Sequence, residues 1–390
     1  MNYDFDTIID RSGTSSSKWD RRKEDVEEPD VLPMWVADMD FVSPPSVVEA
    51  LRQRVEHGIY GYTERTDSYY EALASWMKRR FGWDIQKEWI VYTPGVVVAL
   101  NLIIQAFTQP GDKVIIQQPV YHPFSYAILN NRRRLVNNQL RIEKGRYVMD
   151  FDQLKGSIDR STKLLILCSP HNPVGRVWTK EELLQLAAIC LENDIILVSD
   201  EIHGDLILDG NIHTPTATLS AEIADITITC TAPTKTFNIA GLGVANTIIS
   251  NADLYDRFHA VVSNTGLEMT NVFAKVASEA AYNHGEGWLS HLLIYLQRNY
   301  KFLISFLKTH IPRVNVFPLE GTYLAWLDFR ELGLKDKELR RLLIHEARVW
   351  LDEGTKFGSG GEGFQRMNIG CPRKLLEEGL ERIVSAIDNL

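Results

Sequence analysis

The sequence predicts an α/β fold in which a mostly parallel sheet lies between two layers of helices. Between about residues 45 and 285, short apolar runs rich in Val, Ile and Leu alternate with amphipathic helical stretches. Runs of this kind are typical of strands that are buried on both faces. The predicted strands are 113–117, 163–168, 195–199, 226–229 and 245–249.

From about residue 286 the pattern changes and predicts a second, smaller α+β domain. A long helix over 288–310 is followed by strand-like runs at 314–318 and 322–327, a helical stretch at 336–347 and a terminal helix after Pro372. The first 44 residues carry scattered prolines, so we expect an irregular segment that packs on this smaller domain. A chain of 390 residues is long enough for two domains. We assign 45–285 to the large domain and 1–44 with 286–390 to the small one.

Composition excludes several classes of partner. The net charge of −9 disfavours nucleic acid and anionic membranes, which both reward clustered Lys and Arg. No apolar run approaches the roughly 20 residues that span a bilayer, and the acidic amino terminus does not resemble a secretion signal. The four cysteines are far apart and form no metal-binding pattern. We therefore expect a cytoplasmic protein with reduced thiols and no metal.

Polar side chains follow the predicted strands, and ligands gather at such strand ends in parallel sheets. Asp200 ends a buried run, where it needs a cation such as a protonated ring nitrogen; it could equally cap the next helix. Asn172 stands before Pro173, where it could form only a turn or could donate to an aromatic hydroxyl. Both alternatives stay open for each residue.

Three further features have a functional and a structural interpretation. Tyr121 follows another strand, where it could stack on a planar ligand or simply pack. The turn at 93–99 opens a helix, and free amides at a helix start bind phosphate, although one glycine is a weak signal. Lys235 lies in a loop after a strand, as a nucleophilic lysine would, but most loop lysines are solvated charges.

Taken together and in this order, these residues resemble the fold-type-I enzymes that depend on pyridoxal 5'-phosphate (PLP), the aspartate aminotransferase superfamily. The jointly specific part is Asn172-Pro173 with Gly175, then Asp200, then Lys235. Longer segments resemble the MalY/PatB group of C–S β-lyases, which includes cystathionine β-lyases. They are PMWVADMDF (33–41), YGYT (60–63), PVYHPF (119–124), SDEIHGDL (199–206), TKTFNIAGLG (234–243) and QRMNIGCPR (365–373).

The resemblance implies roles around the cofactor ring. Lys235 would form a Schiff base with PLP and then move the Cα proton of the substrate. Asp200 would pair with the pyridine nitrogen, and Asn172 would bond the phenolic oxygen, which His203 would also touch. Tyr121 would stack on the ring. Lys235, Tyr121 and Asp200 are thus the expected catalytic residues.

The resemblance also implies how the phosphate is bound and how the chain assembles. Backbone amides of Val96 and Val97, with the Thr234 hydroxyl, would hold the phosphate. Tyr62 would reach the phosphate and substrate from a neighbouring subunit, which implies a homodimer with shared active sites. Eight residues after the lysine, where relatives carry an arginine, this chain has Gly243, so the individual phosphate ligands are in doubt.

For the substrate, the resemblance implies that Arg366 binds the α-carboxylate of an amino acid, with Trp35 and Val36 nearby. The expected reaction is α,β-elimination from L-cystathionine or a related cysteine S-conjugate, giving a thiol, pyruvate and ammonia. An aminotransferase would use the same cofactor and most of the same residues. A further regulatory role through protein contacts is the second alternative; no DNA-binding motif is present.

Overall fold

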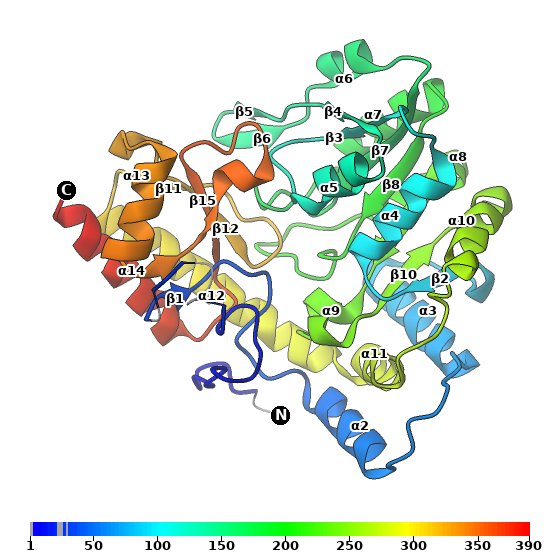
Figure 1. Ribbon diagram of the computed structural model, residues 1–390, viewed down its shortest axis with the longest axis horizontal. Coiled ribbons are helices and arrows are strands. Elements are labelled where there is room, and N and C mark those ends of the chain that lie inside the picture. The colour runs from blue at the N-terminus through cyan, green and yellow to red at the C-terminus, as the bar shows by residue number, and fades with distance from the viewer. Residues whose placement is uncertain (1–2, 22–25, 29) are drawn as a thin grey trace.

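The computed structural model describes residues 3–21, 26–28 and 30–390 (Figure 1). Its main sheet has seven strands in the order β2-β10-β9-β8-β7-β3-β4. Only β10 runs antiparallel to its neighbours, and the other pairs among β9, β8, β7, β3 and β4 are parallel. The strands are β2 (Ile90–Thr93), β3 (Lys113–Ile116), β4 (Arg134–Asn137), β7 (Thr162–Cys168), β8 (Ile196–Asp200), β9 (Thr227–Thr231) and β10 (Ala245–Ile248).

Both faces of this sheet are buried, as the sequence predicted. On β3, Val114 and Ile116 pack with the helices of one face, whereas Ile115 packs with those of the other. This alternation follows from the two-residue period of a strand. The first face is covered by α4 (Val96–Phe107), α5 (Pro123–Asn130) and α10 (Ala252–Asn264), and the second by α6 (Phe151–Ser157), α7 (Lys180–Glu192) and α8 (Ala221–Ile226). The predicted α/β fold class is therefore confirmed.

A smaller antiparallel sheet, in the order β11-β12-β15-β14, lies in the left half of Figure 1. Its strands are β11 (Asn315–Val316), β12 (Leu324–Asp328), β14 (Asp352–Glu353) and β15 (Phe364–Asn368). The helices around it are α12 (Glu286–His310), α13 (Asp336–Arg341) with a π-helical turn at Leu342–Glu346, and α14 (Arg373–Asp388). The predicted helix over 336–347 thus changes its winding halfway.

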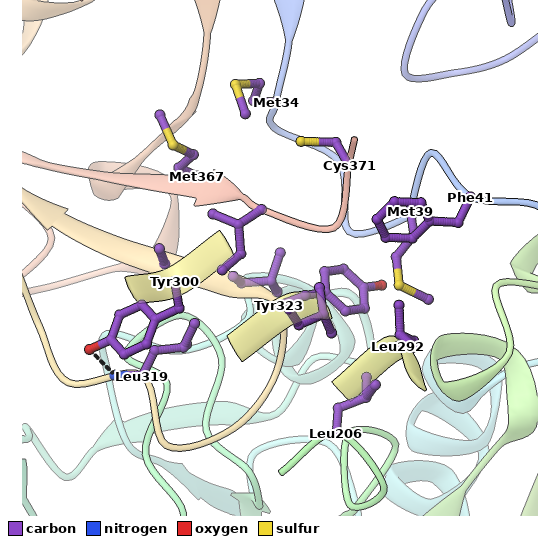
Figure 2. Close-up of a cluster of buried hydrophobic side chains, with 14 of the residues drawn as sticks. Met34, Met39, Phe41, Leu206, Leu292, Tyr300, Leu319, Tyr323, Met367 and Cys371 are labelled. Atoms are coloured by element: carbon purple, nitrogen blue, oxygen red, sulfur yellow. Dashed lines mark hydrogen bonds between the residues drawn. The ribbon is translucent and has the colours of Figure 1, made fainter. Parts of the chain in front are cut away.

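The amino-terminal segment joins this smaller sheet region through β1 (Leu32–Pro33), which pairs in parallel with β13 (Val349–Trp350). Figure 2 shows Met34, Met39 and Phe41 of this segment among buried side chains that include Leu292 of α12, Tyr323 just before β12 and Met367 of β15. The same apolar cluster includes Leu206 of the large region, so the core is continuous across the proposed boundary. We keep the division at residues 45 and 286 as a proposal.

The remaining elements connect or flank these two regions. They are helices α2 (Pro45–Glu56), α3 (Asp67–Phe81), α9 (Pro233–Thr236) and α11 (Val272–His284), and strands β5 (Arg141–Glu143) and β6 (Arg146–Val148). None of the described helices is long and apolar enough to cross a membrane. All four cysteines are buried, and none forms a disulfide.

Candidate active site

A pocket of about 250 Å³ lies at the carboxyl ends of β7, β8 and β9. It brings together eight of the residues predicted to form the site, from segments that are distant in the sequence. This is the edge of the sheet where parallel α/β folds place ligands. The eight residues are Val96, Val97, Tyr121, Asn172, Asp200, His203, Thr234 and Lys235.

Asp200 is the last residue of β8 and lines the pocket. The residue is buried, with 4% of its surface exposed. Within the described part of the chain, its side chain receives one hydrogen bond, from the amide of Ile202 at 3.2 Å. Burial raises the pKa of Asp200 to about 7, and nearby Lys235 opposes this only weakly. A carboxylate in this state lacks a cationic partner, and a ligand could supply one.

Lys235 lies in the short helix α9, which follows β9 directly. Its Nζ donates a hydrogen bond to the carbonyl of Ala37 at 2.6 Å, so the amino-terminal segment covers the lysine. Burial lowers the pKa of Lys235 to about 8; Asp38 raises it and Arg366 lowers it further. Lys235 therefore loses its proton more readily than an ordinary lysine, and the unprotonated amine is the form that a nucleophile or base requires.

The amide of Asn172 has a defined orientation because Arg366 binds its oxygen. Nη1 of Arg366 donates to Oδ1 of Asn172 at 3.0 Å, and Nδ2 of Asn172, a residue that lines the pocket, donates to no side chain or carbonyl of the described residues. The assignment follows from the donor-only chemistry of arginine. Asn172 can thus donate to an oxygen of a bound ligand.

Arg366 lies on β15 and is almost fully buried, with 3% of the residue exposed. Its Nη2 donates to the carbonyl of Trp35 and to a carboxylate oxygen of Asp352, both at 2.7 Å. Its Nε has no partner among the described residues. The guanidinium is therefore held in place from two sides, and one buried donor remains for a ligand such as a carboxylate.

His203 and Tyr121 complete the walls of the pocket. Burial lowers the pKa of His203 to about 3, so its imidazole is neutral, and Nδ1 has no partner within the described part of the chain. Burial raises the pKa of Tyr121, which keeps its phenol protonated. The His203 ring also meets the ring of Tyr323 edge to face, with centroids 6.1 Å apart.

The start of α4 offers backbone amides that can bind an anion. Val96 and Val97 occupy the first turn, where amides lack intrahelical acceptors, and no side chain caps this end. Thr234 lines the same pocket and brings a hydroxyl. Gly243 adopts a left-handed backbone with φ of 64°, and a Cβ there would approach the carbonyl of Pro94 at 3.2 Å. An arginine is therefore disfavoured at Gly243 on backbone grounds.

The other predicted residues lie outside this pocket. Trp35 stacks on Trp350 with ring centroids 4.4 Å apart, and the Val36 carbonyl accepts a bond from Asn368, so both belong to the segment that covers Arg366. Tyr62 is 95% exposed and does not line the pocket of its own chain. Its predicted contact requires a second subunit.

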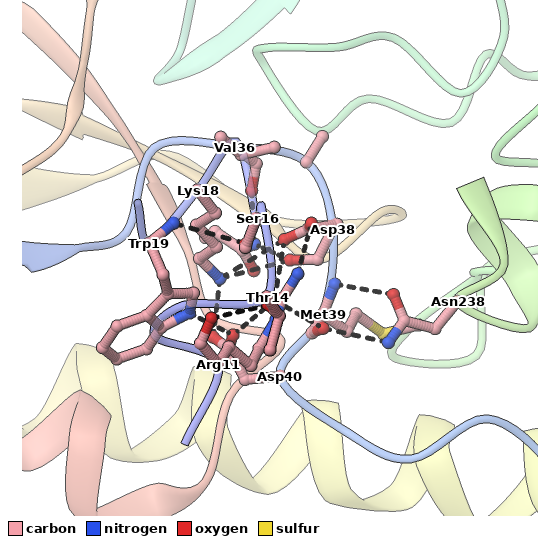
Figure 3. Close-up of polar contacts among 12 residues, drawn as sticks. Arg11, Thr14, Ser16, Lys18, Trp19, Val36, Asp38, Met39, Asp40 and Asn238 are labelled. Carbon is pink, nitrogen blue, oxygen red and sulfur yellow. Dashed lines mark hydrogen bonds and ion pairs between the residues drawn. The ribbon is translucent and has the colours of Figure 1, made fainter. Parts of the chain in front are cut away.

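Four residues near the site were not predicted from the sequence: Ala37, Asp38, Tyr323 and Asp352. The Ala37 carbonyl accepts bonds from both Lys235 and the Tyr323 hydroxyl. Figure 3 shows how this segment docks: the side chain of Asn238, three residues after Lys235, bonds both backbone groups of Met39 at 2.9 Å. A backbone carbonyl leaves no signal in a sequence, and Asp352 could have been found only by knowing which strand lies beside β15.

The fold and this site define a member of a known enzyme family. Residues 29–383 match the model of the aminotransferase class I and II family, to which this chain belongs. Among curated relatives, cystathionine beta-lyase PatB of Bacillus subtilis (strain 168) is 46% identical over 98% of this chain and 99% of the relative. Protein MalY of Escherichia coli (strain K12) is 34% identical over 99% of both chains.

Solved structures give the same result. Cystalysin from Treponema denticola, whose structure contains a pyridoxal 5'-phosphate cofactor, is 41% identical with a TM-score of 0.97 over the full length of both chains. The PLP-bound C-S lyase from Staphylococcus hominis is 37% identical with a TM-score of 0.93, covering 99% of this chain and 98% of that one. The predicted resemblance to the MalY/PatB group is confirmed.

Proposed function

We propose that this protein is a PLP-dependent C–S β-lyase that cleaves L-cystathionine or related cysteine S-conjugates to a thiol, pyruvate and ammonia. Relatives that align along nearly the entire chain include a cystathionine beta-lyase and a C-S lyase. The observation that carries the proposal is the pairing, in one pocket, of a buried carboxylate lacking a cation, Asp200, with a lysine of lowered pKa, Lys235.

The residues present fit PLP. Asp200 needs a cation, which a protonated pyridine nitrogen provides. Asn172 and His203 both line the pocket, and the Asn172 amide group and the His203 Nδ1 atom, which has no partner among the described residues, could bond a phenolic oxygen there. The open start of α4 supplies amides for the phosphate. Tyr121 would then cover one face of the ring.

When bound, PLP supplies an electron sink that stabilises negative charge at the substrate Cα. The chain's own residues do the rest. Arg366 binds the α-carboxylate and so orients the Cα–H bond toward Lys235. The neutral Lys235 amine takes this proton at Nζ and can pass a proton to the departing sulfur. The segment at Trp35–Ala37 covers Lys235 and Arg366 through its backbone carbonyls.

One incubation tests the reaction. Purified protein with PLP and L-cystathionine, without any 2-oxo acid, should release pyruvate, ammonia and free thiol in equal amounts. An aminotransferase would instead be silent until 2-oxoglutarate is added and would then leave the C–S bond intact. That result would refute the lyase. Borohydride reduction and peptide mapping should label Lys235; a label elsewhere would refute the assignment of the lysine.

We further propose a cytoplasmic homodimer with shared sites. The support is an exposed apolar surface on α2, the segment after it and the loop before α11, which Arg65 ties together by a bond to Thr270. Large apolar surfaces of this kind mark interfaces. A second copy of the chain would cover them and bring Tyr62 to the other subunit's phosphate site. The exposed residues are Val48, Val55, Ile59, Tyr60, Tyr62 and Met269.

A further inference from the structure

A second cavity, of about 670 Å³, adjoins the cofactor pocket at Lys235. The two spaces share Ala37, Lys235 and Ala240, so the reactive amine stands at the junction between them. The wall of the second cavity is formed by the amino-terminal segment, including Arg11 and Asp38. A substrate whose Cα lies near Lys235 can therefore extend its far end into this space.

The wall carries a four-membered ion cluster, which Figure 3 shows. Asp40 is buried and bonds Lys18 at 2.6 Å, Arg11 at 2.7 Å and the Trp19 indole at 2.9 Å. Asp38 receives Nη2 of Arg11 at 2.8 Å, and its carboxylate lies 3.8 Å from Lys18. Asp40 and Lys18 are enclosed by protein, with side chains 4% and 1% exposed.

Asp38 and Arg11 are more exposed than the inner pair, although the cavity lining also includes Asp40. Their side chains are 23% and 24% exposed and retain contact with solvent. The wall therefore presents one carboxylate and one guanidinium side by side, next to an amine that acts on the substrate. This is the complement of an amino-acid zwitterion, whose ammonium would meet Asp38 and whose carboxylate would meet Arg11.

We propose that this cavity is the subsite for the leaving half of the substrate and that Asp38 and Arg11 select thiols that carry a second amino-acid group. The proposal rests on the lyase function proposed above. Asp38 directly follows Ala37, whose carbonyl lies 2.6 Å from the Lys235 amine, so the charged wall begins one residue from the reacting atoms. The far ends of L-cystathionine and L-cystine meet it; a simple S-alkyl group does not.

A zwitterion adds no net charge to the cluster, which contains two cations and two carboxylates. Its ammonium and carboxylate can share Asp38 and Arg11 without leaving either one unpaired. Because both groups are partly exposed, we expect a selective effect of moderate size and not an absolute requirement.

The test compares two substrates in the same Asp38→Asn variant. L-cystathionine carries the distal zwitterion, and S-ethyl-L-cysteine presents the same C–S bond to Lys235 without it. We expect kcat/KM for L-cystathionine to fall by about tenfold or more relative to S-ethyl-L-cysteine, because a hydrogen bond to a charged group is lost. The ratio cancels changes in folding, cofactor content and the pKa of Lys235, which affect both substrates alike.

Two additions make the result decisive. S-(2-aminoethyl)-L-cysteine, which has the distal ammonium alone, should lose activity with L-cystathionine in Asp38→Asn. The matched control is Asp20→Asn, which disturbs the same segment through the bonds Asp20 receives from Gly13 and Ser16 but does not line the cavity. Its substrate ratio should equal that of the wild type.

The outcomes separate this proposal from the function on which it rests. An equal loss for both substrates in Asp38→Asn, or the same change of ratio in Asp20→Asn, would overturn the subsite. Failure of the unmodified protein to release pyruvate from either substrate would overturn the lyase itself.

Discussion

Asp200 and Lys235 line one pocket, yet no hydrogen bond joins them, and burial is the main cause of both pKa shifts. The carboxyl has a raised pKa and the amine a lowered one, so each group is displaced toward its neutral form. An ion pair would do the opposite. The pocket therefore keeps both groups available for a ligand and does not let them neutralise each other.

This state predicts a pH-dependent stability of the PLP-free protein. Because the folded pKa of Asp200 is about 7 and the ordinary pKa of an aspartate is 3.8, the buried carboxylate destabilises the fold increasingly as pH rises through that window. Asp200→Asn should therefore raise the free energy of unfolding by a few kcal/mol, on the order expected from such shifts, at pH 8.5 but little at pH 4.5. Thermal denaturation of PLP-free protein at both pH values measures it.

The exposed Asp209 gives the control, because Asp209→Asn should change the melting temperature little at either pH. A gain for Asp200→Asn that is equal at both pH values would contradict the raised pKa. In the PLP-loaded protein, Asp200→Asn should be less stable than the unsubstituted protein, because the variant binds the cofactor more weakly.

A second prediction concerns the buried pair of Arg366 and Asp352. Arg366→Ala leaves Asp352 without its closest cation and should lower the free energy of unfolding by about 3 kcal/mol. Adding Asp352→Asn should recover part of this loss, since the uncompensated charge is removed. Denaturant titration measures both. Arg330→Ala removes a pair with Asp328 whose arginine is 53% exposed, and should change stability by less than about 1 kcal/mol.

At the scale of single residues, the sequence allowed us to predict those that act through their own side chains. Lys235, Asp200 and Asn172 follow strands and occur in an order that the family shares, and the pocket contains all three. The roles of the Ala37 carbonyl and of Asp352 could not be predicted from the sequence, for a physical reason. Their parts depend on which segments meet across the fold, and no local pattern around either residue expresses that pairing.

Among the elements, α4 links the proposed phosphate site to the sheet. It begins without a capping side chain, which leaves the first-turn amides for a ligand. At the preceding Gly95, ψ is 155°, a conformation compatible with a following proline. A proline at the first position of α4 would therefore remove one backbone amide donor without breaking the helix.

Val96→Pro should thus weaken retention of PLP while the fold persists, because it removes one amide donor from the first turn of α4. Absorbance of bound cofactor after dialysis measures retention, and circular dichroism verifies the helix content. Lys180→Pro is the matched control, since Lys180 begins α7 after Thr179 with a ψ of 160°. Equal cofactor loss in the two variants would argue against a phosphate at α4.

The strands of the large sheet were predictable because burial on both faces leaves continuous apolar runs, as in β7 and β8. The short strands β2 and β4 were not identified, and both are edge strands of four residues. The reversed direction of β10 was also unpredictable, since an apolar run reads the same for either orientation. The sequence therefore predicted the fold class, whereas only the structure showed the order of the strands in the sheet.

At the scale of the whole molecule, the exposure of Tyr62 predicts assembly. The protein should behave in solution as a particle of twice the 44.5 kDa chain mass. If Tyr62 acts in the other subunit, mixing Lys235→Ala chains with Tyr62→Ala chains should restore activity, because one site of each mixed dimer is then intact. Native mass spectrometry and the lyase assay measure both. Mixtures with no more activity than their parents would contradict a shared site.

The pairing of Leu32 with Val349 has a consequence for the order in which the molecule is completed. β1 is synthesised before the main sheet, whereas its strand partner β13 is synthesised after all seven strands of that sheet. The walls from Val96 to Lys235 can therefore fold while Ala37 is still undocked. Until the segment with β1 and Ala37 docks, the pocket is uncovered and accessible to a bulky planar ligand. This segment, which is synthesised before the sheet, is then the one that closes the pocket.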